Sequence, residues 1–244
     1  MQMVKILAIL LVLVETTVSG QIVQIDTLRL QESERFVEIQ SDKMNFPIIR
    51  TESKRIDSLI NFDLKNRFTS NEYPNESIDS TLIKWAGDQI IYMEFEVTYN
   101  KDGMLSLNIS AEGCGAYCSS WTDYFNYSTI SGEALDISEI IDITGEFGTR
   151  IHTDKETLYD QQKQELREML NDKESGLDSM TYKWALEYYH DCESSVDLKS
   201  FAIYPDRLEI IEFCYLPNAI KNLTPTISLK YDNSEIGKYL KIKN

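Results

Sequence analysis

The sequence predicts an α+β fold in which antiparallel sheets, built from hairpins, have helices packed on them. The first observation is the run at 91–99, whose apolar and polar side chains alternate as in a half-buried strand. The second is the turn sequence at 100–103, followed by another alternating run at 105–110, which together predict a hairpin. The third is a pair of helical apolar patterns that begin near Ser53 and Leu177.

The elements expected before this hairpin are a strand pair and a helix. Residues 21–30 are expected to form a strand, and residues 35–40 are a candidate partner for it. Residues 46–49 are expected to be extended, since a proline disfavours helix in the residue before it. The helix that begins at Ser53 has an apolar stripe, and polar residues at 70–75 end it. The stripe consists of Ile56, Leu59, Ile60 and Leu64.

A third strand is expected in the aromatic run at 121–127, after a loop at 113–118 that contains glycine and cysteine. Ser131 and Gly132 then turn the chain into residues 135–140. The segment 90–141 is therefore the part around which the rest of the fold is expected to be arranged.

Two helices are expected in the second half of the chain. Residues 145–148 have the composition of a hinge, and residues 153–156 fit a capping box that begins the first helix. Residues 171–176 break that helix. The second helix is indicated by an apolar stripe and is expected to end near Cys192. Its stripe consists of Leu177, Met180, Trp184 and Tyr188.

The chain is expected to end in a second hairpin, a last strand and a short helix. The hairpin pairs 201–204 with 208–215, the last strand spans 227–231, and Asp232 begins the helix. The hinge is the natural boundary between two lobes, at 21–145 and 146–244.

The first twenty residues are expected to be a secretory signal peptide. A basic Lys5 precedes an apolar core at 6–14, and small residues lead to a cleavage site before Gln21. The alternative is a membrane anchor, but a span needs about 20 apolar residues, and Glu15 interrupts this run. We therefore expect a secreted or periplasmic protein without a stable membrane anchor.

Four cysteines in an exported chain indicate two disulfides, for which three pairings exist. Spacing favours the pairs Cys114–Cys118 and Cys192–Cys214. The alternative is a zinc site, but the spacings do not fit paired Cys-x-x-Cys motifs, and the chain has 2 histidines. No metal and no cofactor are expected.

The formal net charge is −16. Such a field repels nucleic acid and anionic membranes and attracts cationic partners. The alternative interpretation is that the acidic side chains only keep an exported protein soluble.

No catalytic motif is present: the sequence has no nucleophile elbow, zinc-protease helix, phosphate loop or dinucleotide fingerprint. His152 precedes the predicted helix cap, and His190 falls in a last helical turn, where a positive charge is favourable. A glycosidase-like carboxylate pair is defined by separation in space, so it cannot be chosen among 40 acidic residues. No catalytic residue is assigned.

Three aromatic residues near the first cysteine pair are candidate ligand-binding residues: Tyr117, Trp121 and Tyr124. Their rings could stack on a sugar or anchor a protein partner, because tyrosine and tryptophan supply rigid contact area. The alternative is structural, with Trp121 in the core and Tyr117 packed on the disulfide.

The order of elements resembles the extracytoplasmic domain family shared by the anti-sigma factor RsiV and the non-catalytic region of the peptidoglycan deacetylase PdaC. The resemblance covers most of the mature chain, and its motifs describe turns and core faces. They are residues 45–49, 60–61, 97–100, 105–107, 115–116, 124–127, 131–135, 208–210, 216–219 and 227–231.

This resemblance implies a non-catalytic binding module for a lysozyme-like protein or for cell-wall glycan, such as peptidoglycan fragments. The chain departs from the pattern at Tyr117, where many relatives have histidine. It also lacks a sigma-binding region and a deacetylase domain, so neither activity is carried over. The alternative is a cell-wall glycan hydrolase or deacetylase that uses unrecognised carboxylates.

Overall fold

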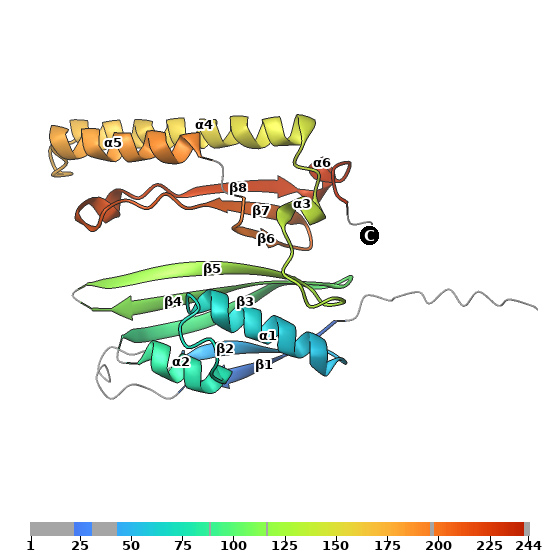
Figure 1. The fold of residues 1–244 in the computed structure, drawn as a ribbon. Coiled ribbons are helices and arrows are strands. Elements are labelled where there is room, and N and C mark those ends of the chain that lie inside the picture. Colours follow the sequence, from blue (N-terminus) through green and yellow to red (C-terminus); the bar gives the residue numbers. More distant parts are fainter. Residues whose placement is uncertain (1–21, 31–42, 88, 116, 196–197, 242–244) are drawn as a thin grey trace, which may run out of the picture.

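The fold consists of two halves that face each other through their β-sheets (Figure 1). It is seen in a computed structural model that describes residues 22–30, 43–87, 89–115, 117–195 and 198–241. The predicted signal peptide at 1–20 and the candidate strand at 35–40 lie outside the described residues. Antiparallel sheets combined with helices confirm the predicted α+β class.

The first half begins with an antiparallel strand pair on which a helix packs. The Asn61 side chain ties the helix to the second strand: its amide donates to the Ile49 carbonyl and accepts from the Ile49 N–H, both at 2.8 Å. As predicted, residues 46–49 are extended, and the polar residues after Thr69 end the helix. These elements are β1 (Gln24–Arg29), β2 (Asn45–Arg50), α1 (Lys54–Phe68) and the shorter helix α2 (Ile78–Ala86).

A three-stranded antiparallel sheet forms the centre of the molecule, with strand order β3-β4-β5. Asp102 and Gly103, with φ of 55° and 78°, make the turn of the predicted hairpin. One face of the sheet packs against α1 and α2 through buried residues that include Leu107 and Phe125. The strands are β3 (Ile90–Lys101), β4 (Met104–Cys114) and β5 (Cys118–Ser128).

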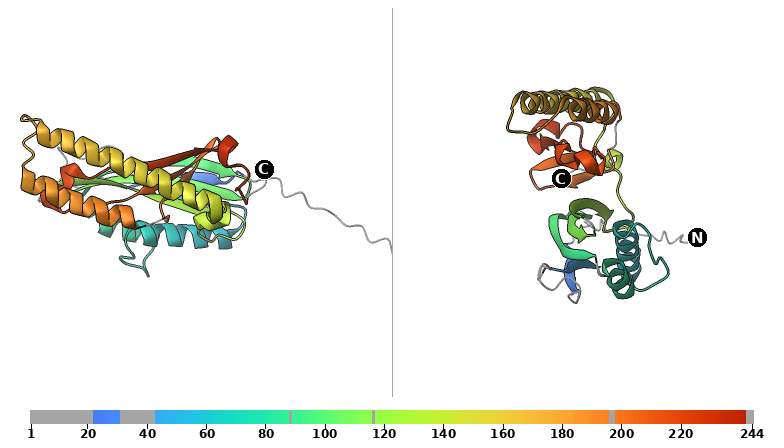
Figure 2. Two further views of the ribbon diagram at one scale, coloured as in Figure 1. Left: turned by 90° about the horizontal axis from the view of Figure 1, so that it is seen from above. Right: turned by 90° about the vertical axis from the view of Figure 1, so that its left-hand side faces the viewer.

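The second half is a smaller antiparallel sheet covered by a long helical hairpin (Figures 1 and 2). The predicted hairpin at 201–215 and last strand at 227–231 are both present. The elements are α3 (Ile137–Ile140), α4 (Gly145–Asn171), α5 (Ser179–Ser194), β6 (Phe201–Ile203), β7 (Arg207–Glu212), the 3-10 helix η2 (Asn218–Leu223), β8 (Ile227–Asp232) and α6 (Asn233–Ile236).

Buried hydrogen bonds and shared apolar packing join the two halves. The Asn126 amide donates to the Phe201 carbonyl at 2.8 Å, and the Ile203 N–H donates to the Ser106 hydroxyl at 3.0 Å. Tyr99 and Met104 of the central hairpin belong to the same buried cluster as Ile203. The second half therefore packs directly on the face of the central sheet opposite α1.

The start of α4 differs from the predictions. Residues 145–148 are not a linker between elements, because they form the first turn of α4, which continues to Asn171. A bending motion at these residues stays a prediction. Gly148 is needed for a packing reason: a Cβ at this position would collide with the carbonyl oxygen of Ile143. The residues at 153–156 do not cap a helix either, since the Thr153 hydroxyl donates to the Thr149 carbonyl inside α4.

The helix predicted to end near Cys192 is present as α5. Its apolar face is only partly as predicted: Leu177 and Tyr188 pack against a buried cluster, but Met180 is 78% exposed, and Ala185 and Tyr189 are the buried residues of this helix. Helix α2 was not predicted. Throughout the part of the chain that the structure describes, no helix has both the length and the apolar character needed to cross a bilayer.

Candidate binding groove

A groove of about 610 Å³ lies at one end of the central sheet, between α2 and the loop that joins β4 to β5. Ligand pockets typically measure about 300–1,000 Å³. We call it the aromatic groove. Its lining consists of Glu72, Tyr73, Lys84, Trp85, Ala86, Gly87, Gln89, Ile90, Gly113, Cys114, Gly115 and Trp121.

Helix α2 places Trp85 in this groove. The helix begins where the Ser77 hydroxyl accepts a hydrogen bond from the Ser80 N–H at 3.3 Å, and Asp79 lies in its first turn. It ends at Gly87, whose φ of 42° is a conformation that favours glycine. Trp85 thus lies in the last turn of the helix, beside the end of the sheet.

Two tryptophan rings form one wall of the groove. Trp85 and Trp121 meet edge to face, with ring centroids 6.2 Å apart and an interplanar angle of 85°. Trp85 also packs on Phe68, 4.9 Å away, which holds its ring against the core. A Cβ at Gly113 would be in ordinary contact with the Trp121 ring at 3.5 Å and in a tight contact with the Ile90 Cδ1 at 3.2 Å. Both indoles are half-buried and fixed in position.

A third ring, Tyr73, lies at the edge of the groove and is 42% exposed. The Lys84 ammonium lies 5.4 Å from its centroid, a cation–π contact. Lys84 also forms an ion pair with Glu76. Glu72 and Gln89 add polar groups to the lining. The groove therefore combines aromatic faces with a few hydrogen-bonding side chains, the composition typical of small-ligand and sugar sites.

Asp123 is a half-buried carboxyl group next to Trp121. Burial raises the pKa of this carboxyl, while the indole N–H of Trp121 and the charge of Arg67 act in the opposite direction. The Arg67 guanidinium lies over the Phe125 ring at 5.0 Å. Asp123 thus helps to fix the orientation of the Trp121 indole.

The three predicted ligand-binding residues do not form one cluster. Trp121 lines the aromatic groove and packs on the core of the first half. Tyr124 lies three positions further along β5, so it projects from the opposite face of the sheet. Burial raises the pKa of Tyr124, and Glu209 and Tyr204 of the second half add to the effect. Tyr117 is 84% exposed, on the far side of the Cys114–Cys118 loop from Trp121.

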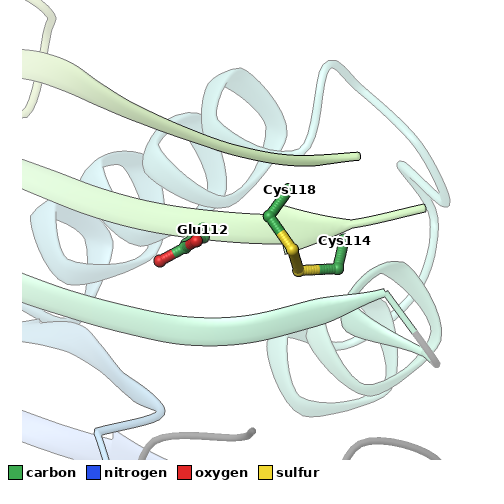
Figure 3. A group of neighbouring side chains, drawn as sticks. All are labelled: Glu112, Cys114 and Cys118. Carbon is green, nitrogen blue, oxygen red and sulfur yellow. A yellow bond between two sulfur atoms is a disulfide. The ribbon is translucent and has the colours of Figure 1, made fainter. Parts of the chain in front are cut away.

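The disulfide Cys114–Cys118 closes this loop, with a Cα–Cα distance of 4.0 Å (Figure 3). The carboxylate of Glu112 lies beside it, and one ligand atom from each of the three residues falls within 4.8 Å of the others. The two sulfur atoms are bonded to each other, so they are not the thiolates that a zinc site requires. The cluster therefore serves to hold the end of the β4–β5 hairpin together.

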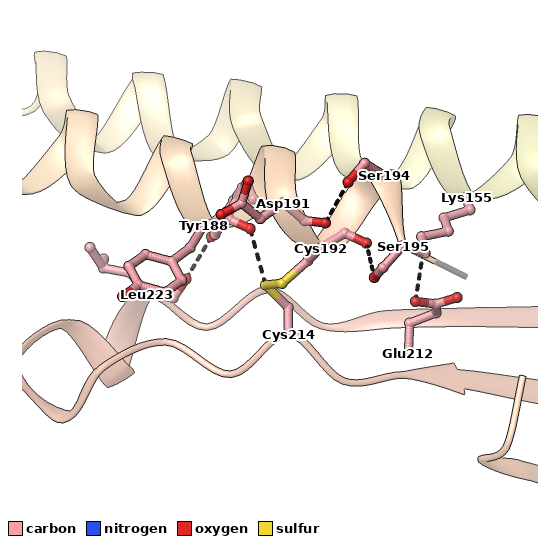
Figure 4. Close-up of a disulfide and its surroundings, with 10 residues drawn as sticks. Lys155, Tyr188, Asp191, Cys192, Ser194, Ser195, Glu212, Cys214 and Leu223 are labelled. Atoms are coloured by element: carbon pink, nitrogen blue, oxygen red, sulfur yellow. Dashed lines mark hydrogen bonds and ion pairs between the residues drawn. A yellow bond between two sulfur atoms is a disulfide. The ribbon is translucent and has the colours of Figure 1, made fainter. Parts of the chain in front are cut away.

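The second disulfide, Cys192–Cys214, ties the end of α5 to the chain after β7 (Figure 4). Both disulfides pair the cysteines that the spacing favours. Disulfides are typical of proteins that fold in an oxidising, extracytoplasmic compartment.

A larger cavity of about 1,070 Å³ lies between α1 and the β1–β2 strands. Its lining is mixed in charge, and Phe62 is its single aromatic residue among those described. Two exposed charges of this lining, Asp26 and Arg50, form an ion pair at 3.2 Å. Because it offers no wall of several rings, we regard the aromatic groove as the better candidate.

Sequence reasoning missed Tyr73, Trp85 and Gln89 as groove residues. Trp85 could have been found, because Ser77 and Gly87 are ordinary start and stop signals for a short helix. Tyr73 could not, since its place depends on a turn in which its own φ is 51°.

Two solved structures have a similar fold. One is a member of the DUF3298 family from Bacteroides fragilis, with a TM-score of 0.54 and 13% identity, covering 91% of this chain and 94% of that one. The other is a DUF3298 family protein from Pseudomonas aeruginosa PAO1, with a TM-score of 0.51 and 12% identity, covering 90% and 94%. The chain shares their fold. No protein-family model matches the sequence, and no curated protein does.

Proposed function

We propose that this protein is an exported, non-catalytic binding module that holds a glycan in the aromatic groove. The observation that carries the proposal is the pair of edge-to-face indoles, Trp85 and Trp121, with Tyr73 beside them. Aromatic faces stack on the C–H faces of sugar rings, and the polar lining groups can hydrogen-bond to hydroxyl and amide substituents.

The lining favours binding over hydrolysis. Glycosidases place two carboxyl groups on opposite sides of the scissile bond, whereas Glu72 is the single carboxylate among the described residues that line the groove. We choose cell-wall glycan as the ligand because the resemblance to the RsiV and PdaC domain family implies a module that is exported to the cell envelope, where this polymer is present.

Calorimetric titration with soluble peptidoglycan fragments tests the proposal. Tyr73→Ala and Trp85→Leu should each weaken binding about tenfold or more, as expected for aromatic anchors. Trp184→Ala, which removes a tryptophan from α5 outside the groove, is the matched control and should bind normally. Circular dichroism checks that each variant is folded. Binding that survives both groove substitutions would contradict this site.

A second candidate ligand is a cationic, lysozyme-like protein, favoured by the formal net charge of −16. Complementary potentials would speed the encounter and fix its orientation. Attraction at long range should then weaken as salt shortens the Debye length from about 10 Å at 0.1 M to about 3 Å at 1 M. Binding to lysozyme across a salt series, with a basic protein of equal charge as control, tests this. If the control protein binds with equal affinity, the acidic side chains serve only to keep the protein soluble, and the lysozyme proposal is contradicted.

A further inference from the structure

A third cavity, of about 400 Å³, lies on the other side of the Cys114–Cys118 loop. We call it the loop cavity. It lies between the two halves, because its lining comes from the start of β5 and from η2. The lining residues are Tyr117, Cys118, Ser119, Asn218 and Lys221.

The disulfide-closed loop is a wall shared by the two cavities. Gly113, Cys114 and Gly115 line the aromatic groove, and the next described residues of the same loop line the loop cavity. The space beside Gly115 is open, since a Cβ added there would meet no atom within 4 Å. A linear ligand in the groove can therefore continue over the loop into the loop cavity.

The chemistry of the loop cavity differs from that of the groove. Its described lining contains no carboxylate, although the chain has 40 acidic residues. The Lys221 ammonium donates one hydrogen bond to the Ser119 hydroxyl. An ammonium has three N–H donors, so two remain for a ligand. Within the described part of the chain, no carboxylate lies within ion-pair distance of Lys221.

We propose that one glycan chain occupies both cavities and that the loop cavity binds a sugar unit bearing a carboxylate. Lys221 donates to the carboxylate, the Asn218 amide binds neighbouring polar groups, and the exposed Tyr117 ring stacks on the sugar. This inference rests on the proposed function and adds the ligand's class: an acidic linear glycan in place of a neutral one.

The overall acidity of the protein makes this lysine significant. At −16, the long-range field disfavours an anionic ligand. At physiological salt the field is screened beyond about 8 Å, so the contact with Lys221 decides the affinity for a single carboxylate. Removing this charge should therefore affect acidic glycans and leave neutral ones unchanged.

Calorimetric titration of the protein purified from an exporting host, with two oligosaccharides of equal length, tests the inference. One is a neutral oligomer of N-acetylglucosamine, and the other alternates N-acetylglucosamine with N-acetylmuramic acid, which has a carboxylate. We expect tighter binding of the acidic oligomer, and Lys221→Gln should weaken that binding about tenfold. Binding of the neutral oligomer should not change.

Lys173→Gln is the matched control, because it removes the same positive charge at an exposed position that lines neither cavity. It should retain the preference for the acidic oligomer. Equal affinity of the wild-type protein for both oligomers, or equal loss of both in Lys221→Gln, would overturn this inference and leave the glycan site intact. Failure of both oligomers to bind would overturn the proposed function together with this inference.

Discussion

At the scale of single residues, the ion pair between Lys155 and Glu212 is the most deeply buried charge contact described. The Lys155 Nζ lies 2.8 Å from the Glu212 Oε2, and the two side chains are 1% and 3% exposed (Figure 4). Lys155 also donates to the Ser195 carbonyl at the end of α5. One lysine thus links α4, α5 and β7.

We expect Lys155→Met to lower the free energy of unfolding by about 3–5 kcal/mol, because it leaves the Glu212 carboxylate buried without its cation. Urea denaturation measures the change. The double variant Lys155→Met, Glu212→Leu should recover most of the loss, since an apolar pair of similar volume fills the space. A double variant no more stable than the single one would show that the cost comes from packing.

Asp123 allows a prediction about pH. Burial raises the pKa of its carboxyl in the folded protein, so the folded state binds this proton more tightly than the unfolded state. Asp123 therefore favours folding at acidic pH, and this contribution is lost as pH rises through the raised pKa. Asp123→Asn should remove the dependence and keep an acceptor for the Trp121 indole. The test is to measure the melting temperatures of the wild type and of Asp123→Asn between pH 4 and pH 7, at about one-unit steps. If the melting temperature depends on pH in the same way in both proteins, the prediction is contradicted.

At the scale of elements, α5 depends on its N-cap residue, Asp178. The Asp178 carboxylate accepts hydrogen bonds from the Thr181 and Met180 N–H groups, and these bonds lower its pKa. Because the pKa is lowered, the charged cap stabilises the fold at pH values above the usual aspartate pKa. This stabilisation is lost as the pH falls through the pKa of Asp178 in the folded state.

Asp178→Ala should therefore lower the melting temperature at pH 7, whereas Asp178→Asn should retain most of it, because asparagine caps equally well. Both variants should approach the wild type at pH values well below about 3.9. Thermal melts followed by circular dichroism provide the measurement. A deficit of Asp178→Ala that is unchanged at low pH would indicate a role other than charge-assisted capping.

The two disulfides should differ in their effect on stability. Cys192–Cys214 closes a loop with a sequence separation of 22, and the chain-entropy relation gives about 3 kcal/mol for it. Cys114–Cys118, with a separation of 4, gives about 2 kcal/mol. Replacing each pair by alanine and measuring urea unfolding should reproduce this order, and the reverse order would contradict it.

Strands were easier to predict than helix faces. The predicted alternation is confirmed for Met93, Phe95 and Val97, which pack in one cluster with the apolar residues of β4, because a two-residue period leaves one choice of buried face. It is wrong at Tyr99, which packs in the cluster on the other face because the strand register shifts between Val97 and Tyr99. In α5 the stripe through Met180 and Trp184 is as regular as the buried one through Ala185 and Tyr189. The choice between them depends on tertiary packing against α4, η2 and the chain after β7, so it could not be read locally.

The aromatic groove was only partly predictable for the same reason. Trp121 was identified from its own strand. The signals at Ser77 and Gly87 could have placed Trp85 on a short helix, α2, but not beside Trp121. Trp85 and Trp121, which make this edge-to-face contact, are 36 positions apart in the sequence. Such a pairing is a property of the tertiary fold.

At the scale of the whole molecule, we expect the two halves to unfold together. Tyr99 and Met104 of the central hairpin are buried in the same cluster as residues of the C-terminal sheet, and Asn126 and Ser106 add buried hydrogen bonds across the contact. Shared burial makes separate unfolding of either half costly.

Spectroscopic probes can report on the unfolding of each half separately. In a Trp184→Phe variant, fluorescence reports the first half through Trp85 and Trp121, while far-ultraviolet circular dichroism is dominated by α4 and α5. The two urea transitions should coincide. Separated midpoints would show instead that the lobes expected at 21–145 and 146–244 are independent domains.

The helical hairpin and the groove lie on opposite sides of the molecule. Figures 1 and 2 show α4 and α5 on the outer face of the C-terminal sheet, with α2 beyond the central sheet. The turn between α4 and α5 nevertheless lies at the same end of the molecule as the β4–β5 loop beside the groove (Figure 1). A biotin acceptor peptide inserted after Asp206, in the turn between β6 and β7 at the other end, would therefore immobilise the protein on a sensor with its aromatic groove turned towards the flowing solution. Such an orientation suits the protein to surface capture of cell-wall polymers too large for calorimetry.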